Sequence, residues 1–453
     1  TSLAGVENLT ALTTLYCDGN QLTSLAGVEN LTALTTLNCN GNQLTSLAGV
    51  ENLTALTTLY CNGNQLTSLA GVENLTALTT LNCNGNQLTS LAGVENLTAL
   101  TRFYSMGNPV KRVPHVFLND IDGLRAYWHD IANTGATPNN HNKLLLLGNG
   151  RVGKTTLCHA LVENTPQTDK PACKSTEGIC LMNWTVENIN QQHWQVNIWD
   201  FGGQEIYHAT HRLFHSQEGV YCVLWAEETD EAEDEMQHSL RYWLDLVTQH
   251  NTDCPVIVVK NQVDRSNNDG LQNEALNAEQ YRNLPHYGVS ALHNTRTAPL
   301  RAEIIEQFKN LSALQIELPN SWLKVKEKLT AISRPSISRS EFENLGDSSA
   351  NSDALLDYLH HCGTIFYQPD YFDGQIFLDQ NWVLTAVYRL FEKDKSFYNV
   401  RERIENNSGK VTGENLLEIY SDYQPDEVRL FVDFMQQCQM VFKLTSDHNE
   451  RLR

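Results

Sequence analysis

The sequence predicts three folds in series: a repeat solenoid, a doubly wound α/β domain with a parallel sheet, and a small α+β unit. One 22-residue unit recurs five times over residues 1–110. Four consecutive leucines then lead into a glycine-rich turn that ends in Lys154 and Thr155. After residue 313, helix-like and strand-like patterns alternate over short distances. At 453 residues the chain is too long for one core, which agrees with about three domains.

Composition limits the classes of function. The formal net charge of −21 argues against a surface built to bind nucleic acid or an anionic membrane. No apolar run approaches the roughly 18 residues that span a bilayer, and no signal-peptide pattern follows Thr1. The eleven cysteines include no CxxC pair and no metal-ligand spacing. Free thiols in a reducing compartment are therefore expected, and the predicted location is the cytoplasm.

The repeats each begin with a threonine, at Thr1, Thr23, Thr45, Thr67 and Thr89. In the first unit the pattern L-x-x-L-x-(L/C)-x-x-N-x-L is filled by Leu12, Leu15, Cys17, Asn20 and Leu22. This spacing resembles that of leucine-rich repeats, which stack into a solenoid with one shared core. The cysteine column is accordingly expected to be buried and apolar, and not to ligate a metal.

The exposed face of each predicted strand offers a surface for a partner. Thr14, Tyr16 and Asp18 occupy it in the first repeat. The position before the cysteine alternates between two residue types, in the order Tyr16, Asn38, Tyr60 and Asn82, which indicates duplication of repeat pairs. The expected ligand is a protein that the sequence does not identify, and the alternative that the repeats are only a spacer stays open.

Residues 111–142 are predicted to close the solenoid and connect it to the next domain. A helix over 116–132 has apolar residues at helical spacing, at Phe117, Ile121, Leu124, Trp128 and Ile131. The following stretch, 133–142, reads as a linker by its small and polar composition.

The glycine-rich turn fits G-x-x-x-x-G-K-[ST], with Gly148, Gly153, Lys154 and Thr155 in the fixed positions. A buried-strand run precedes it and a plausible helix follows. Glycines let several N–H groups point at one phosphate chain, Lys154 supplies a cation, and the Thr155 hydroxyl supplies an oxygen ligand for Mg²⁺. The predicted nucleotide contacts in this loop are Gly148, Asn149, Gly150, Arg151, Val152, Gly153, Lys154, Thr155 and Thr156.

A second motif follows an alternating strand that ends at Asp200 and continues to Gln204. It resembles the D-x-x-G-Q of Ras-type GTPases. Asp200 is expected to hold Mg²⁺ through water, the Gly203 N–H to reach a γ-phosphate, and Gln204 to position the attacking water. Thr176 is the candidate for a further Mg²⁺ ligand.

Arg212 is the nearest candidate for an arginine that stabilises developing phosphate charge, and an ordinary surface cation is the open alternative.

A third motif provides base recognition. The strand predicted over 255–264 ends in Asn261, Gln262, Val263 and Asp264, which resembles N-K-x-D. Asp264 can accept from N1 and N2 of guanine, a pairing that adenine lacks. Gln262 replaces the usual lysine, so weaker affinity is expected. Ser290 and Ala291 follow another strand, where a backbone N–H is expected to meet the guanine O6.

Together these segments resemble the five GTPase boxes in order, and leucine-rich repeats joined to such a domain resemble the Roco family. This resemblance implies a Roc GTPase domain at 143–312 and the N-terminal part of a COR domain at 313–453. The COR segment is expected to be winged-helix-like, with a helix over 426–444 that ends in a strand. No glycine-rich kinase loop with H-R-D and D-F-G motifs is found.

The resemblance implies a Mg²⁺-dependent GTPase that slowly hydrolyses GTP to GDP. Lys154, Gln204 and Arg212 are the candidate catalytic residues. Nucleotide state would control the arrangement of repeats, Roc and COR in signalling, and the full-length protein would form a homodimer through COR. The competing hypothesis is a scaffold that binds nucleotide without turnover and binds a partner through its repeats.

Overall fold

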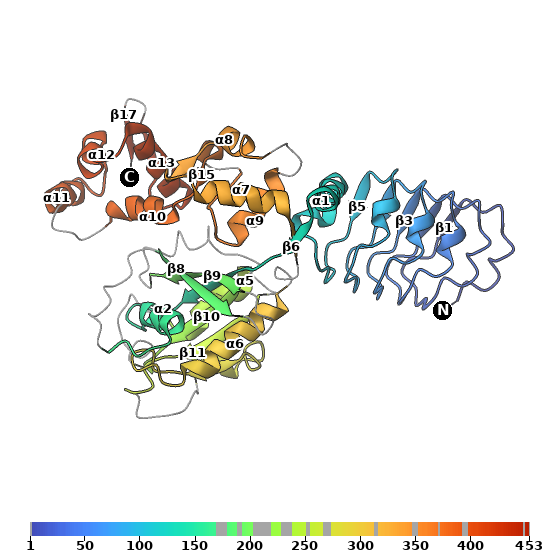
Figure 1. Ribbon diagram of the computed structural model, residues 1–453, viewed down its shortest axis with the longest axis horizontal. Helices are drawn as coiled ribbons and strands as arrows, with labels where there is room; N and C mark the ends of the chain where they lie inside the picture. The colour runs from blue at the N-terminus through green and yellow to red at the C-terminus, as the bar shows by residue number, and fades with distance from the viewer. Residues whose placement is uncertain are drawn as a thin grey trace. The chain divides into compact units, whose positions relative to one another are not determined.

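The computed structural model describes residues 2–168, 179–187, 193–202, 219–227, 238–250, 254–265, 273–311, 316–346, 352–369, 372–391, 397–446 and 449–452. The chain forms two compact units. Figure 1 shows its helices and strands, coloured from blue at the N-terminus to red at the C-terminus. Unit 1 comprises residues 1–139, 312–328 and 343–358. Unit 2 comprises residues 140–311, 329–342 and 359–453.

Unit 1 begins with the predicted solenoid. Its parallel sheet has one three-residue strand per repeat, β1 (Thr14–Tyr16), β2 (Thr36–Asn38), β3 (Thr58–Tyr60), β4 (Thr80–Asn82) and β5 (Arg102–Tyr104). Three of the repeats also contain a 3-10 helix, η1 (Val50–Asn52), η2 (Val72–Asn74) and η3 (Val94–Asn96). From the second repeat on, the central strand residue, such as Leu37 or Leu59, is buried in the shared core, whereas Leu15 of β1 is half-buried. Equivalent residues pair across every strand, so each column of the sequence repeat becomes a column on the sheet.

An asparagine ladder joins neighbouring repeats. The Nδ2 group of Asn42 donates to the carbonyl oxygens of Cys17 and Cys39, both at 3.0 Å. Its Oδ1 atom accepts from the Leu22 N–H at 2.9 Å. The expected burial of the cysteine column is confirmed. Burial raises the pKa of Cys39 to about 12, so the thiol stays protonated.

The capping helix α1 runs over Ile121–Thr134, after the 3-10 helix η4 (His115–Asn119). The Asp120 side chain caps it by accepting from the Gly123 N–H at 2.9 Å. The predicted apolar positions Phe117 and Leu124 are buried, whereas Trp128 is only half-buried and Tyr127 takes the inner position.

The stretch 133–142, expected to be a linker, instead contains the end of α1, a three-residue strand and the start of the strand that follows. β6 (Ala136–Pro138) pairs antiparallel with β13 (Glu317–Pro319), and the Tyr127 hydroxyl donates to the Glu317 carbonyl oxygen. Composition missed this strand because its partner lies far along the sequence.

Unit 2 contains a six-stranded sheet in the order β12-β11-β10-β7-β9-β8, parallel except for β8. Its strands are β7 (His141–Leu147), β8 (Ile179–Glu187), β9 (His193–Phe201), β10 (Val220–Trp225), β11 (Val256–Lys260) and β12 (His286–Gly288). Parallel strands carry their carboxyl ends to one edge, so the predicted motifs converge there.

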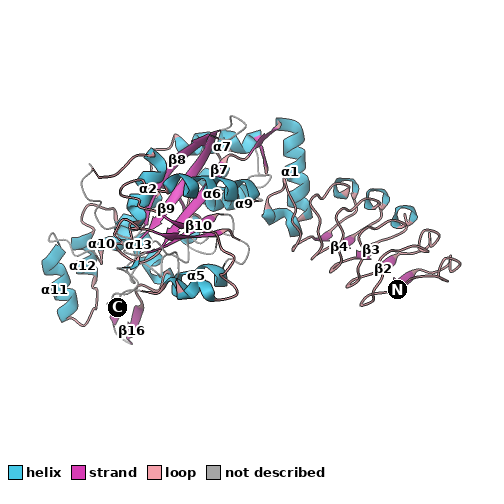
Figure 2. Cartoon of the chain, turned by 90° about the horizontal axis from the view of Figure 1, so that it is seen from below, coloured by secondary structure: helices cyan, strands magenta, loops and turns pink. Residues whose placement is uncertain are grey.

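Alternate residues of β7 face opposite sides of the sheet. Leu145 and Leu147 belong to a core that also contains Trp243 of helix α5 (Leu240–His250). Leu144 and Leu146 are equally buried but lie outside that cluster. Figure 2 shows the sheet strands with helices α2 (Lys154–Glu163) and α6 (Thr297–Asn310).

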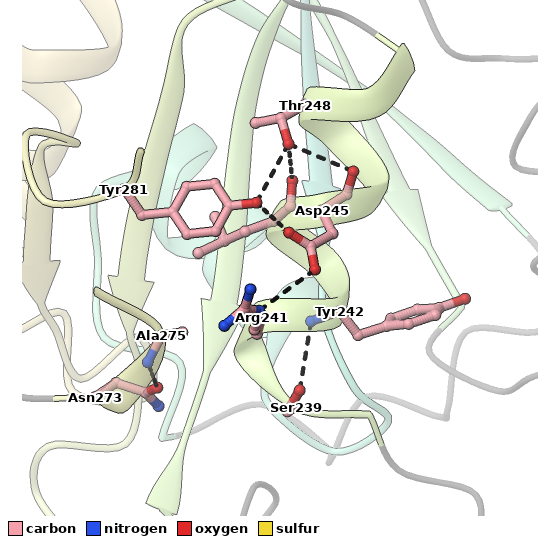
Figure 3. Close-up of polar contacts among 9 residues, drawn as sticks. Ser239, Arg241, Tyr242, Asp245, Thr248, Asn273, Ala275 and Tyr281 are labelled. Atoms are coloured by element: carbon pink, nitrogen blue, oxygen red, sulfur yellow. Dashed lines mark hydrogen bonds and ion pairs between the residues drawn. The ribbon is translucent and has the colours of Figure 1, made fainter. Parts of the chain in front are cut away.

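Helix α5 is fixed by polar contacts to the segment after η6 (Glu274–Asn277), as Figure 3 shows. The Tyr281 hydroxyl donates to the Asp245 carboxylate, which also pairs with Arg241 at 3.6 Å. The hydroxyls of Thr248 and Tyr281 are 3.3 Å apart. These contacts orient helix α5, whose first turn contacts the glycine-rich turn over residues 148–153 (the phosphate loop).

The C-terminal third is α+β, as predicted. Its strands are β14 (Ser336–Ile337), β15 (Ile376–Phe377), β16 (Lys443–Ser446) and β17 (Asn449–Leu452). Its helices are α7 (Asn320–Thr330), α8 (Arg339–Glu343), α9 (Ser352–His361), η8 (Phe372–Gly374), α10 (Gln380–Arg389), α11 (Tyr398–Asn406), α12 (Gly413–Ile419) and α13 (Pro425–Gln437). The helix expected over 426–444, followed by a strand, is thus confirmed as α13 and β16. Within unit 2, Phe366 and Phe434 join the same core as Trp243.

Among the helices of the described ranges, none combines the length and apolar character needed to cross a bilayer.

Candidate functional site

The predicted site residues that the structure describes lie at or just beyond the carboxyl ends of strands of the unit 2 sheet. The glycine-rich turn follows β7, Asp200 lies at the end of β9, and Asn261 follows β11. Ser290 lies beyond β12 and is buried. The doubly wound fold therefore collects segments from across the sequence at one edge, where such sheets bind their ligands.

Lys154 starts helix α2 and is buried inside its own loop. Its Nζ atom donates to the carbonyl oxygens of Gly148 at 2.6 Å and Asn149 at 2.8 Å. Burial lowers the pKa of Lys154 to about 8, while the nearby Asp200 carboxylate acts in the opposite direction. The ammonium group is thus held within the loop by neutral acceptors, from which an anionic phosphate can draw it.

Backbone geometry explains both fixed glycines. Gly148 has a φ of +140°, and a Cβ atom there would lie 2.3 Å from the Leu224 carbonyl oxygen. Gly153 has a φ of +90°, and a Cβ atom would lie 2.4 Å from Asn261 Nδ2. Any side chain at either position would push the loop off the neighbouring strands.

Thr155 and Asp200 meet at the start of α2. The Thr155 hydroxyl donates to Asp200 Oδ2 at 2.5 Å, and the Asp200 residue is fully buried. A hydroxyl and a carboxylate side by side form the all-oxygen donor set that Mg²⁺ prefers. These two predicted metal ligands therefore fit the ion by position and by chemistry.

Asn261 connects three of the predicted segments. Its Nδ2 group donates to the Val152 carbonyl oxygen at 2.9 Å, and its Oδ1 atom accepts from the Ala291 N–H at 3.0 Å. Its own N–H donates to the Trp225 carbonyl oxygen at 2.9 Å. One buried amide thus holds the phosphate loop at a fixed distance from the predicted base-recognition segments.

The base-recognition residues are also brought together. The Gln262 side chain donates to the Arg151 carbonyl oxygen at 2.8 Å. Asp264 lies at the surface, with its Oδ2 atom 3.6 Å from Nε2 of His293. A carboxylate beside an imidazole ring can exchange that neighbour for the two N–H donors of guanine.

The Asn149 side chain contacts residues that precede and begin α5. Its Nδ2 group donates to the His238 carbonyl oxygen at 2.7 Å. Its Oδ1 atom accepts from the His238 N–H and from Trp243 Nε1, both at 3.0 Å. The amide therefore ties the phosphate loop to the start of α5, and only the backbone of Asn149 remains for a phosphate contact. No sequence motif indicated this tie.

The remaining loop residues surround Lys154. Val152 is buried, Gly150 and Thr156 are half-buried, and Arg151 is exposed with a φ of 65°. Four predicted residues lie outside the described part of the chain: Thr176, Gly203, Gln204 and Arg212.

The fold and this edge define a Ras-like GTPase domain between leucine-rich repeats and a C-terminal α+β segment. Three domain families match the chain in that order. "Leucine Rich repeats (2 copies)" matches residues 10–52 and 54–99, "Ras of Complex, Roc, domain of DAPkinase" matches 143–264, and "C-terminal of Roc, COR-A domain" matches 319–452. The chain belongs to the Roco family.

Two curated proteins are similar to this chain over more than half of its length. A Roc-COR-CHAT protease of Runella zeae is 27% identical over 307 residues, which are 62% of this chain and 31% of that protein. The probable serine/threonine-protein kinase pats1 of Dictyostelium discoideum is 28% identical over 56% of this chain and 9% of its own length. The chain thus spans a third or less of both relatives.

A solved structure shares the fold. Roco2 RocCORdC of Methanosarcina barkeri bound to GDP is 25% identical, with a TM-score of 0.57. The match covers 70% of this chain and 95% of that one.

Proposed function

We propose that this chain binds GTP and GDP with Mg²⁺ at the carboxyl edge of the unit 2 sheet and slowly hydrolyses GTP. The observation that carries the proposal is the Asn261 side chain, which joins the phosphate loop to Ala291 of the base segment. A nucleotide bound along that line would place its phosphates at Lys154 and its guanine at Asp264. The similar Roco2 structure was solved with GDP, which supports the choice of ligand.

Hydrolysis would proceed by attack of water on the γ-phosphate. Lys154 would leave the carbonyl oxygens of Gly148 and Asn149 and neutralise charge on the phosphates. Gln204 is the proposed water-positioning residue and Arg212 a proposed source of charge stabilisation. Mg²⁺, when bound, would supply further charge neutralisation, and Thr155 and Asp200 would hold it, with Thr176 as an additional candidate.

Base selection would depend on the Asp264 carboxylate. Guanine offers it two N–H donors, whereas adenine would leave a carboxylate facing an acceptor. The Gln262 side chain is engaged with the Arg151 carbonyl oxygen, so it positions the loop instead of covering the base. We expect guanine selectivity to be kept and the affinity to be modest.

The protein would act as a switch if the bound nucleotide changed the association of two copies of the chain. Phe366 and Phe434 of the C-terminal segment share one core with the sheet residues of unit 2. A change at the phosphate loop can therefore reach that segment through packed side chains. In the full-length protein we propose that this controls a homodimer formed through COR.

The test is direct binding of GDP, GTP and ATP to the purified chain by titration calorimetry with Mg²⁺. Asp264→Asn should lose the preference for guanine by at least about tenfold. Asp426→Asn, an exposed carboxylate on α13, is the matched control and should bind like the wild type. Absence of any guanine preference in the wild type would reject the proposal.

Turnover is tested separately under single-turnover conditions with excess protein. GTP consumption that is abolished in Lys154→Ala supports an enzyme, whereas selective binding without consumption would favour the non-hydrolysing scaffold. Light scattering with GDP and with a non-hydrolysable GTP analogue then shows whether nucleotide changes the mass in solution.

A further inference from the structure

The strand face of the solenoid carries a regular column of two residue types. At the last position of each strand stand Tyr16, Asn38, Tyr60, Asn82 and Tyr104, and the parallel register places them directly beside one another. Tyr16 is 66% exposed and Tyr104 40% exposed, whereas the central Tyr60 is half-buried. The three tyrosines thus form a column of solvent-accessible rings with an amide between each pair.

The spacing of this column can be compared with that of peptide conformations. Adjacent strands lie about 4.8 Å apart, so every second strand repeats at about 9.6 Å. A polyproline II helix has three residues per turn and rises about 3.1 Å per residue, which gives about 9.3 Å per turn. An α-helix returns to one face after seven residues at about 10.5 Å, and an extended strand after about 6.7 Å. Only the polyproline II repeat matches the tyrosines closely.

The asparagines between the tyrosines are oriented for such a ligand. The Oδ1 atom of Asn38 accepts from the Asn40 N–H at 3.2 Å, and that of Asn82 accepts from the Asn84 N–H at 3.1 Å. Within the described chain, no residue accepts from the Nδ2 group of either side chain. Each amide is therefore held by its oxygen with its donor available. A polyproline II segment has no internal hydrogen bonds, so its carbonyl oxygens need such donors.

The lack of charge on this face further limits the class of partner that it can bind. The outward strand positions of the second to fourth repeats carry only Thr, Asn and Tyr. Asp18 and Arg102 stand at opposite ends of the array. An acidic or basic partner would find no complement along the centre, whereas proline rings can stack on tyrosine without any charge.

We propose that this face, Tyr16 to Tyr104, binds a proline-rich segment of a partner protein in the polyproline II conformation. Prolines three residues apart occupy the spaces against successive tyrosines, and the Asn38 and Asn82 amides donate to the carbonyl oxygens between them. The binding depends on neither nucleotide nor turnover.

The experiment uses the whole chain and a fluorescein-labelled polyproline peptide of about eleven residues, long enough for three turns. Binding is followed by fluorescence anisotropy. A Gly-Ser peptide and an amphipathic helical peptide of the same length serve as comparison ligands. We expect the polyproline peptide to bind tightest, with an affinity that changes less than about twofold between low and high salt because no ion pairs form.

The decisive variant is Asn38→Tyr combined with Tyr60→Asn. It keeps the composition and places at each position a residue that other repeats already carry there, but it breaks the two-repeat spacing of the rings. We expect at least about a tenfold loss of polyproline affinity, as for removal of an aromatic residue central to an interface. Asn52→Ala on η1, outside the strand face, should leave the affinity unchanged.

Circular dichroism and the thermal transition of the variant verify that it folds. Equal binding by the variant and the wild type would overturn the proposal, as would absence of polyproline binding or tighter binding of either comparison peptide. GDP should leave the affinity unchanged, so failure here is distinguishable from failure of the proposed GTPase function.

Discussion

Lys154 and Thr155 could be predicted residue by residue because their chemistry requires fixed spacing. The glycines could be predicted for the same reason, and the close approaches at Gly148 and Gly153 supply the physical cause. Asn149 was predicted as a nucleotide contact, but its side chain contacts His238 and Trp243. An amide can hydrogen-bond in any direction, so its partner depends on a helix almost a hundred residues away.

Replacing Asn149 with Ala should loosen the phosphate loop without removing a ligand of the phosphates. Three hydrogen bonds are lost, so we expect a loss of about 2–4 kcal/mol in the free energy of unfolding. Affinity for GDP should fall about tenfold because the loop is no longer fixed. Urea unfolding without nucleotide and calorimetry with GDP measure the two effects. Asn277→Ala, at an exposed position of unit 2, is the control, and unchanged GDP affinity in Asn149→Ala would contradict this role.

A second residue of unit 2, Lys143, lies buried over the Trp199 ring at 4.3 Å. Burial lowers its pKa to about 7, and the nearby Cys362 and Cys254 act in the opposite direction. The neighbouring His360 has a pKa well below its usual value through burial and through Lys143. Both groups bind fewer protons in the folded state than in the unfolded state.

Stability should therefore rise with pH. Between about pH 7 and 10.5 the unfolded lysine is protonated while folded Lys143 is increasingly neutral. The gain is at most about 1.4 kcal/mol per pH unit. Urea unfolding at several pH values should show this rise in the wild type and a smaller one in Lys143→Met. His360 adds a loss of stability as the pH falls below about 6.5 in both proteins. If the free energy of unfolding rose equally with pH in both proteins across the alkaline range, the effect assigned to Lys143 would be ruled out.

At the scale of elements, periodic patterns predicted most of the fold. The repeat strands followed from the 22-residue period, and β7 and β11 from apolar runs followed by motifs. β6 could not be predicted, because Ala136–Pro138 becomes a strand only by pairing with Glu317–Pro319. The buried face of α1 also differed from the prediction, which placed Trp128 there. Tyr127 is buried instead, because its hydroxyl bonds a carbonyl oxygen that is distant in sequence.

The contribution of the asparagine ladder to stability can be tested by comparing an asparagine that bonds across repeats with one that does not. Asn64 is buried and contacts Cys39, Cys61 and Leu44 across two repeats. Asn20 in the first repeat is exposed and contacts only carbonyl oxygens of its own turn. We expect Asn64→Ala to lower the free energy of unfolding by about 2–4 kcal/mol and Asn20→Ala to lower it by less than about 1 kcal/mol. Chemical unfolding followed by circular dichroism compares them, and equal losses would mean that the contacts between repeats contribute little.

At the scale of the molecule, each unit has its own buried residues, so two unfolding transitions are expected in calorimetry. GDP with Mg²⁺ binds only unit 2 under the proposed function. At a hundredfold excess over Kd it should stabilise that unit by about 2.7 kcal/mol and leave the other transition in place. Asn64→Ala should lower only the transition of unit 1. A single transition that shifts as a whole with GDP would show that the two units unfold together.

The chain leaves unit 1 after residue 139 and returns to it only at residues 312–328 and 343–358. During synthesis, β6 therefore emerges from the ribosome long before β13, with which it forms a two-stranded sheet. The β6 segment therefore stays without that partner while the GTPase domain is translated and folds, although η4 and α1 can already cover the last repeat. Folding of that inserted domain restricts the separation of its two ends and so lowers the entropic cost of closing a very long loop. Pairing of β6 with β13, and with it the completion of unit 1, thus becomes a late event in biogenesis.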